Sequence, residues 1–184
     1  MRKLIFQMLI SLDGYYEGLN HEIDWHVVED EFNDYANNLI QSAGIILFGR
    51  VTYQMMASFW PSAVALHTDP VTAKLMNETP KIVFSKTLKT VDWKNTTLIN
   101  TDPVKEISRL KKLPGKDLVM LASSDLAVSL LKEGVIDEFQ VIINPIILGS
   151  GKSLFKGLDQ RVPLKLVKTQ VFKSGVIILT YQPD

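Results

Sequence analysis

The stretch DLVMLASSDLAVSLLKEGVIDEFQVII, residues 117–143, carries the pattern that decides the fold. It begins with a short apolar run at Asp117–Leu121, which is typical of an interior strand. Small residues then lead into a helical pattern at Leu126–Lys132, which stops before Gly134, as helices commonly stop before a glycine. A second apolar run follows at Phe139–Ile143. The stretch therefore predicts a strand–helix–strand unit, the building block of an α/β sheet.

The same alternation runs through the earlier part of the chain. Apolar runs at Leu4–Leu12, Gly44–Phe48 and Lys81–Phe84 predict further strands, and the second of them is too short and too apolar for a surface helix. The dipeptide Gly49-Arg50 turns the chain into a helix that ends near Phe59. A loop is expected after Pro61. The remaining predicted elements are a helix on the stripe Phe32, Tyr35, Ala36, Leu39, Ile40 and Ala43, a helix near Val71–Glu78, a minor strand at Leu98–Ile99 and a helix around Val104–Leu110.

The last part of the chain has a different pattern. Leu164–Phe172 and Val176–Tyr181 are apolar runs with no helix between them, and Lys173-Ser174-Gly175 joins them in a tight turn, which predicts an antiparallel hairpin. No linker, repeat or low-complexity tract divides the sequence. We therefore expect a single domain over residues 1–184 with a mixed, mostly parallel central sheet, helices on both faces and a C-terminal antiparallel hairpin.

Composition excludes several classes of protein. The 184 residues carry 20 basic and 20 acidic side chains, so no overall field attracts nucleic acid or an anionic membrane. Cysteine is absent, which excludes disulfides and thiol catalysis. The apolar N-terminal run is too short for a signal peptide, because Asp13 and Gly14 follow it directly. We expect a cytoplasmic protein that binds neither nucleic acid nor a membrane.

Three strand-to-helix junctions carry small, hydroxyl or basic residues: Gly49-Arg50-Val51-Thr52, Ser85-Lys86 and Ala122-Ser123-Ser124-Asp125. The N-terminus of a helix offers free N–H donors and partial positive charge, which hold phosphates. In open α/β sheets, ligands bind at the carboxyl ends of the strands. Together the three junctions indicate one extended nucleotide, although no Walker or GxGxxG motif is present.

Each junction also has a simpler interpretation. Ser124 and Asp125, taken alone, are best explained as residues that cap and charge the start of a helix. Arg50 and Lys86, taken alone, are solvated surface charges. The placement of all three junctions at strand ends is what favours a nucleotide site.

Four segments resemble the dihydrofolate-reductase-like superfamily: SLDGYYEG at 11–18, ILFGRVTY at 46–53, KIVFSKTL at 81–88 and LLKEGVIDEFQVIINPIILGSGKSLF at 130–155. The last segment is the most specific of the four. The chain is most similar to stand-alone proteins related to the reductase domain of the riboflavin-biosynthesis deaminase-reductase. The resemblance covers nearly the whole chain and implies NADPH as the cofactor, a small heterocycle as the substrate and a homodimer as the assembly.

The resemblance also implies roles for particular residues. The 2′-phosphate and adenosine end of NADPH would lie against Gly49, Arg50, Thr52, Ser85 and Lys86. The pyrophosphate would lie against Ala122, Ser123, Ser124 and Asp125, where relatives carry a glycine-rich turn. Leu12, Asp13 and Gly14 would edge the nicotinamide and substrate pocket, and Pro145, Leu148, Gly149 and Gly151 would frame its other side.

Asp13 is the candidate catalytic residue, which would orient or protonate the substrate. Trp25, Tyr15 and Tyr16 have two open interpretations, as a wall for a flat ring or as core and rim aromatics. His21, His26 and His67 have no metal-ligand spacing, and we assign them structural or surface roles and expect no metal.

Two departures from the family pattern limit the choice of substrate. The first junction reads Gly-Arg-Val-Thr, whereas the riboflavin reductase carries Gly-x-Gly-Thr there to grip a ribose phosphate. The single pterin-facing acid of dihydrofolate reductases has four candidates here, namely Glu29, Asp30, Glu31 and Asp34. The sequence thus favours an NADPH-dependent reductase of a pterin-like or aminopyrimidine-like heterocycle. The alternative is a non-catalytic module that binds a nucleotide or small ligand on the same fold.

Overall fold

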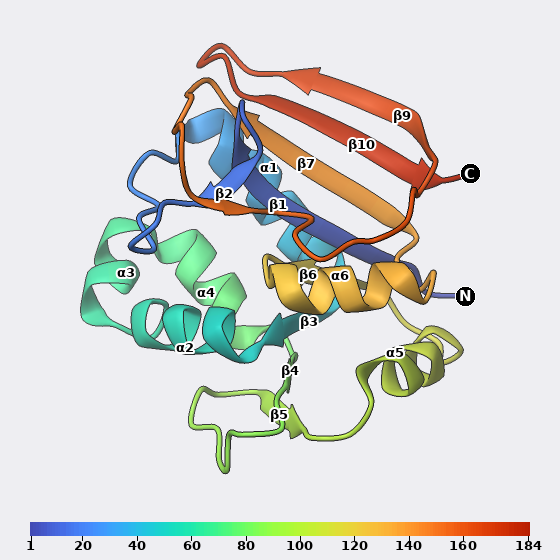
Figure 1. The fold of residues 1–184 in the computed structure, drawn as a ribbon. Coiled ribbons are helices and arrows are strands. Elements are labelled where there is room, and N and C mark those ends of the chain that lie inside the picture. Colours follow the sequence, from blue (N-terminus) through green and yellow to red (C-terminus); the bar gives the residue numbers. More distant parts are fainter.

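The computed structural model describes all 184 residues and centres on an eight-stranded sheet in the order β5-β4-β3-β6-β1-β7-β10-β9 (Figure 1). The strands from β5 to β7 in this order pair in parallel, whereas β10 pairs antiparallel with both β7 and β9. The predicted mixed, mostly parallel sheet is confirmed. The strands are β1 (Leu4–Ser11), β3 (Ala43–Gly49), β4 (Lys81–Phe84), β5 (Thr96–Ile99), β6 (Asp117–Leu121), β7 (Glu138–Asn144), β9 (Leu164–Val171) and β10 (Ile177–Pro183).

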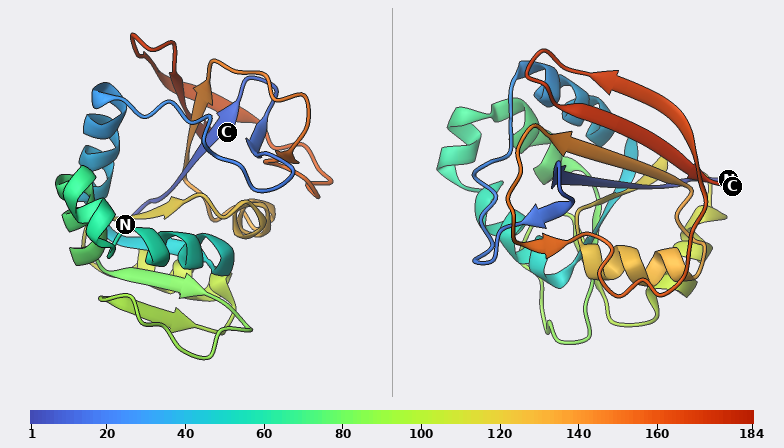
Figure 2. Two further views of the ribbon diagram at one scale, coloured as in Figure 1. Left: turned by 90° about the vertical axis from the view of Figure 1, so that its left-hand side faces the viewer. Right: turned by 45° about the horizontal axis from the view of Figure 1, so that its top comes forward.

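Helices cover the sheet on both faces, as predicted, and Figure 2 shows them from two further directions. Successive side chains of a strand point to opposite faces. Leu4 and Phe6 of β1 accordingly pack in a core with α5 and α6, whereas Ile5 packs in a second core with α1, α2 and α4. The helices are α1 (Asp30–Ser42), α2 (Arg50–Phe59), α3 (Ala63–Thr68), α4 (Pro70–Glu78), α5 (Pro103–Lys111) and α6 (Ser124–Lys132).

The C-terminal hairpin is also confirmed. Gly175 has φ +88°, which suits a glycine, and its N–H donates to the Phe172 carbonyl at 3.0 Å to close the turn. The second strand of the hairpin, β10, lies between β7 and β9, so β9 forms the edge of the sheet.

Two features of the fold were not predicted. The expected loop after Pro61 contains α3, whose Ser62 side chain accepts a hydrogen bond from the Ala65 N–H at 3.2 Å. A separate two-stranded sheet pairs β2 (Tyr15–Glu17) with β8 (Lys152–Ser153). Both strands are too short to show the alternating pattern of a strand in the sequence, and their pairing joins segments at opposite ends of the chain.

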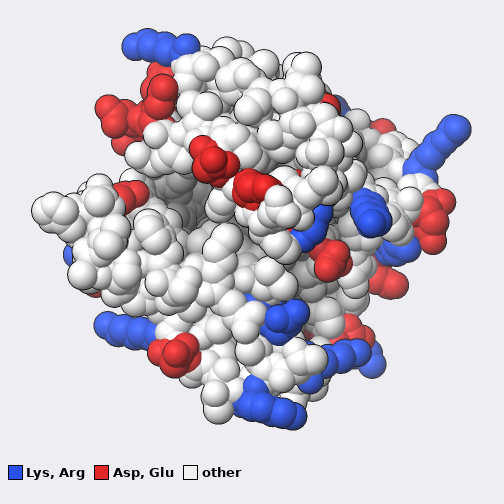
Figure 3. Space-filling view, turned by 60° about the vertical axis from the view of Figure 1, so that its left-hand side comes forward, with Lys and Arg blue, Asp and Glu red and all other residues white.

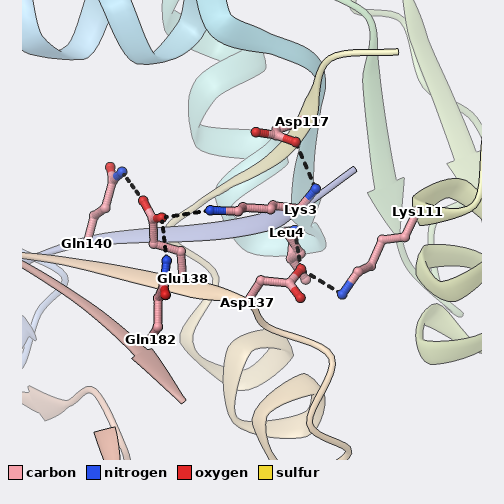
Figure 4. Close-up of polar contacts among 8 residues, drawn as sticks. All are labelled: Lys3, Leu4, Lys111, Asp117, Asp137, Glu138, Gln140 and Gln182. Atoms are coloured by element: carbon pink, nitrogen blue, oxygen red, sulfur yellow. Dashed lines mark hydrogen bonds and ion pairs between the residues drawn. The ribbon is translucent and has the colours of Figure 1, made fainter. Parts of the chain in front are cut away.

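The acidic pair Asp137-Glu138 anchors the beginning of β1, at the end of the sheet away from the three junctions (Figure 4). Asp137 Oδ2 accepts from the Leu4 N–H at 2.6 Å and lies 2.6 Å from the ammonium of Lys111. Glu138 Oε2 lies 3.8 Å from the ammonium of Lys3, the residue before β1. These acids therefore fix strand register and have a structural role. No helix of the fold combines the length and apolarity of a membrane span.

Candidate functional site

The carboxyl ends of β3 and β6 form a topological switch point. The two strands are parallel neighbours in the sheet. From β3 the chain enters α2 on one face, and from β6 it enters α6 on the other face. The two helices diverge from these adjacent strand ends, and open α/β sheets bind ligands in the crevice outside strand ends of this kind.

Ser123 links the two helix N-termini at this crevice. Its Oγ accepts a hydrogen bond from the Gly49 N–H at 2.8 Å and donates to Thr52 Oγ1 at 2.9 Å. Ser123 is the N-cap residue of α6, and Gly49 is that of α2, yet neither helix has a side-chain cap. The expectation that Ser124 or Asp125 caps α6 is therefore wrong, whereas the expectation that an acid charges the helix start is confirmed, since Asp125 lies in the first turn. The first-turn N–H groups of both helices have no side-chain acceptor.

The backbone of this junction adopts a conformation that favours glycine. Ala122 has φ +55° and Ser123 has φ +69°, so two consecutive residues with side chains lie in the left-handed region. Such strain costs about 1–3 kcal/mol per residue and concentrates at functional sites. Across the crevice, a Cβ on Gly49 would lie 3.3 Å from Ser123 Oγ, so the absence of a side chain there permits the close approach.

The structure brings the basic junction residues to the neighbouring strand ends. β3 and β4 are parallel neighbours, and Gly49 lies opposite Phe84. Arg50 and Ser85, the next residues, therefore begin side by side, with Lys86 one residue further on. Arg50 is exposed and donates from Nη1 to Gln54 Oε1 at 3.0 Å. Ser85 Oγ accepts from the backbone N–H groups of Thr87 and Leu88, at 3.2 and 3.0 Å, and so shapes the loop.

Asp13 joins the two segments predicted to frame the substrate. Its carboxylate accepts from the Gly149 N–H at 2.8 Å and from the Leu148 N–H at 3.1 Å. The Ser11 hydroxyl donates to it at 2.6 Å. Hydrogen bonds from Ser11, and then from the two backbone N–H groups, lower the pKa of Asp13. An ionised carboxylate at this position can orient the substrate segments, but it holds no proton to give near neutral pH.

The small sheet of β2 and β8 further connects the turn after β1 with the loop after β7. The adjoining Leu12 N–H donates to the Ile146 carbonyl at 2.8 Å, and the Leu12 side chain is exposed. Lys152 Nζ lies 2.6 Å from Glu17 Oε1, and this contact raises the pKa of Lys152. Gly151 has no room for a side chain, because a Cβ would lie 2.4 Å from the Glu17 carbonyl oxygen. Sequence reasoning missed Ser11, Glu17 and Lys152, since their partners carry no local pattern.

The segment between β2 and α1 crosses the ends of β1 and β7. The Val27 N–H donates to Asn144 Oδ1 at 2.8 Å, and Asn144 is the last residue of β7. Trp25 lies in this segment, where its indole N–H donates to the Glu22 carbonyl at 3.0 Å and its ring meets the edge of His26. His26 Nε2 is buried without a hydrogen-bond partner, and burial lowers the pKa of His26 to about 4.

Two of the four candidate pterin-facing acids lie on the side of α1 that faces β9 and the hairpin turn. Glu31 Oε2 accepts from the Lys173 N–H in the hairpin turn at 2.8 Å. Asp34 lines a groove of about 480 Å³ with Lys168 and Gln170 of β9. Both acids therefore face β9 and its hairpin. The remaining two, Glu29 and Asp30, are the N-cap and first-turn residues of α1.

One face of the molecule is hollowed (Figure 3). Uncharged atoms dominate the walls of the hollow, and acidic groups stand along its upper edge. No group of three or more His, Cys, Asp or Glu side chains is arranged to hold a metal ion. The uncapped starts of α2 and α6 can accept an anion.

A family model for the RibD C-terminal domain matches residues 2–178. The chain belongs to the RibD C-terminal domain family. Curated relatives include the uncharacterized protein YyaP of Bacillus subtilis (strain 168), 34% identical over 98% of this chain and 94% of the relative. The uncharacterized protein YwjB of the same organism is 28% identical over 95% of each chain. The predicted resemblance is confirmed, and the chain falls in a family of reductase domains.

Solved structures show the same fold. A putative riboflavin biosynthesis protein from Shewanella sp. PV-4 has a TM-score of 0.75 at 24% identity and covers 99% of both chains. The Thermotoga maritima deaminase/5-amino-6-(5-phosphoribosylamino)uracil reductase has a TM-score of 0.71 at 14% identity, over 100% of this chain and 57% of that one. Dihydrofolate reductase from Enterococcus faecalis, complexed with NADP(H), has a TM-score of 0.65 at 15% identity, over 99% and 96% of the two chains. The dihydrofolate-reductase-like fold is thereby confirmed.

Proposed function

We propose that this protein is an NADPH-dependent reductase that transfers a hydride to a small pterin-like or aminopyrimidine-like heterocycle. The observation that carries the proposal is the switch point at the carboxyl ends of β3 and β6. It combines two helix N-termini that lack side-chain caps with Arg50 and Lys86 at the adjoining strand ends. The relatives support the same assignment, since one structural neighbour is a dihydrofolate reductase complexed with NADP(H).

The residues at the crevice fit a dinucleotide. Free N–H groups at the starts of α2 and α6 suit its diphosphate. Thr52 and Ser123 hold the helix starts together. Ala122 leads into α6, and Ser124 and Asp125 are the first two residues of that helix. Arg50 and Lys86, with Ser85 shaping their loop, suit a 2′-phosphate, because a guanidinium and an ammonium gain much from a phosphate and little from a ribose hydroxyl. We propose that NADPH binds more tightly than NADH for this reason.

The substrate would lie beside the nicotinamide, with Leu12 and Trp25 among the residues that contact it. When bound, NADPH supplies the hydride, and the protein positions the acceptor ring and excludes water. Asp13 holds Leu148 and Gly149 in place through its carboxylate. Because this carboxylate is ionised, we assign Asp13 an orienting role.

The hollow of Figure 3 and two contacts of charged residues bear on which substrates the protein should turn over. The walls of the hollow are predominantly uncharged, and Lys152 of β8 is paired with Glu17. Glu31 is bonded to the hairpin. We therefore propose weak turnover both of the ribosylated pyrimidine phosphate of the riboflavin pathway and of dihydrofolate. Steady-state assays of both compounds test this, and turnover typical of a dedicated enzyme on either one contradicts it.

A binding module on the same fold is the alternative. Titration of the protein with NADPH and NADH, followed by fluorescence, measures binding, and loss of absorbance at 340 nm with a panel of heterocycles measures turnover. A reductase oxidises NADPH with at least one acceptor. A module that only binds quenches cofactor fluorescence and oxidises none of it.

We further propose that the chain forms a homodimer through the sheet face opposite α1. Across β7, β10 and β9 this face carries the rows Ile143–Ile177–Val171 and Val141–Leu179–Thr169. No helix lies in front of β10 and β9 in Figure 1. Val171 remains 66% exposed and Leu166 49% exposed. An uncharged apolar face of this kind marks an interface, and a second copy presents the same uncharged surface with no net charge to repel it.

Light scattering at micromolar concentration tests the dimer. The wild type is expected at twice the chain mass, and Val171→Lys is expected to shift it to the monomer. Lys168→Glu, on the opposite face of the same strand, is the matched control and leaves the mass unchanged. A monomeric wild type overturns the assembly and leaves the reductase proposal intact.

A further inference from the structure

Ser123 occupies an N-cap position but bonds to a different helix. A serine at an N-cap normally accepts a hydrogen bond from the second or third residue of its own helix. Ser123 instead directs its hydroxyl across the crevice to Gly49 and Thr52, which belong to the start of α2. The α6 N–H groups are thereby left without a side-chain acceptor.

The backbone at Ser123 is also held in an unfavourable conformation. Ala122 and Ser123 both have positive φ, and the Ala122 N–H donates to the Gln7 carbonyl of β1 at 2.9 Å. A residue with a side chain persists there only when its surroundings hold it. Here the hydroxyl supplies contacts that a glycine could not make.

We infer that Ser123 is a positioning residue that fixes the distance between the N-termini of α2 and α6, so that both are preset for the two phosphates of the dinucleotide. This inference rests on the proposed function. Without the tether, the two helix starts must be ordered when the cofactor binds, which weakens binding. Ser123 acts on binding of the diphosphate, whereas Arg50 acts on binding of the 2′-phosphate. Loss of Ser123 should therefore weaken every ligand that carries the diphosphate, and loss of Arg50 should weaken NADPH alone.

Ser123→Gly tests the inference without a folding penalty from the backbone. Glycine accepts positive φ freely, so its conformational benefit offsets the lost hydrogen bonds and the melting temperature stays near that of the wild type. NADPH, NADH and ADP are each expected to bind about tenfold more weakly. In the ligand-free protein, the Gly49 amide is expected to exchange its hydrogen faster, which reports the tether directly.

Three further variants separate positioning from general structure. Thr52→Val removes one partner of the hydroxyl and is expected to weaken all three ligands, whereas Thr52→Ser keeps the hydroxyl and restores binding. Ser62→Gly removes an N-cap serine that bonds within its own helix and leaves the affinities unchanged.

The outcomes are distinguishable. If the wild type binds none of the three ligands, the proposed function fails and this inference fails with it. If the wild type binds and Ser123→Gly binds equally well, this inference alone is overturned. A loss confined to NADPH, or an equal loss in Ser62→Gly, also overturns it.

Discussion

The carboxylate of Asp13 accepts a hydrogen bond of 2.8 Å from the backbone N–H of Gly149, which lies 136 residues further along the chain. This bond ties the turn after β1 to the loop after β7. The three hydrogen bonds on Asp13 also favour its ionised form. The carboxylate of Asp13 is thus ionised and holds the two segments together.

Replacing Asp13 with Ala is expected to release this loop. The substrate segments lose their connection, so kcat/KM for an acceptor should fall about tenfold while the Kd for NADPH changes less than twofold. Asp13→Asn keeps one acceptor oxygen, so its kcat/KM should lie between those of the wild type and Asp13→Ala. Because the pKa of Asp13 is lowered, the pH–rate profile above pH 5 should show no ionisation of this group in the wild type. If the wild type shows an ionisation near neutral pH that disappears in Asp13→Asn, the orienting role is contradicted.

Replacing Arg50 with Gln is expected to weaken NADPH binding by about one to two orders of magnitude, since charged hydrogen bonds contribute roughly 1.5–3 kcal/mol each. NADH binding should barely change, because it has no 2′-phosphate. Fluorescence titration of both variants with both cofactors measures this. Arg109→Gln removes another surface arginine, from α5, and serves as the control. Equal small effects on both cofactors would assign Arg50 to the solvated surface.

Replacing Asp137 with Ala is expected to lower the free energy of unfolding by about 2 kcal/mol. The change removes the acceptor of the Leu4 N–H and the ion-pair partner of Lys111, whose ammonium keeps only its hydrogen bond to the Val135 carbonyl. Urea denaturation measures it. Asp159, an exposed partner of Lys132, is the control, and Asp159→Ala should cost less than about 1 kcal/mol. NADPH affinity should be unchanged in both variants, because Asp137 lies at the opposite end of the sheet.

His26 is expected to make the protein sensitive to acid. Burial lowers the pKa of His26 from 6.5 to about 4, so the unfolded chain binds more protons between these values. Stability is therefore fully present above pH 6.5 and falls as the pH drops towards 4, by at most about 3 kcal/mol from this group. Unfolding free energies measured across this range should show a flatter slope in His26→Phe. An identical slope in the two proteins would remove His26 from the acid response.

Much of the fold could be predicted from local pattern. The apolar runs at Asp117–Leu121 and Gly44–Phe48 were interpreted correctly as interior strands, because a strand covered on both faces has no polar alternation. The hairpin around Ser174 followed from its turn residues. The six-residue helix α3 and the strands β2 and β8 were missed, because elements this short show no period.

The sequence by itself determined the order of the elements, the family and the residue types at each strand end, since these depend on neighbours along the chain. Only the tertiary structure decided which of them meet. Ser123 bonds to Gly49 instead of capping its own helix, Asp13 reaches Gly149, and Glu31 turns to the hairpin. Each of these contacts joins residues 74 to 142 positions apart, so a side chain's partner depends on how the strands are ordered in the sheet. No local propensity encodes that order.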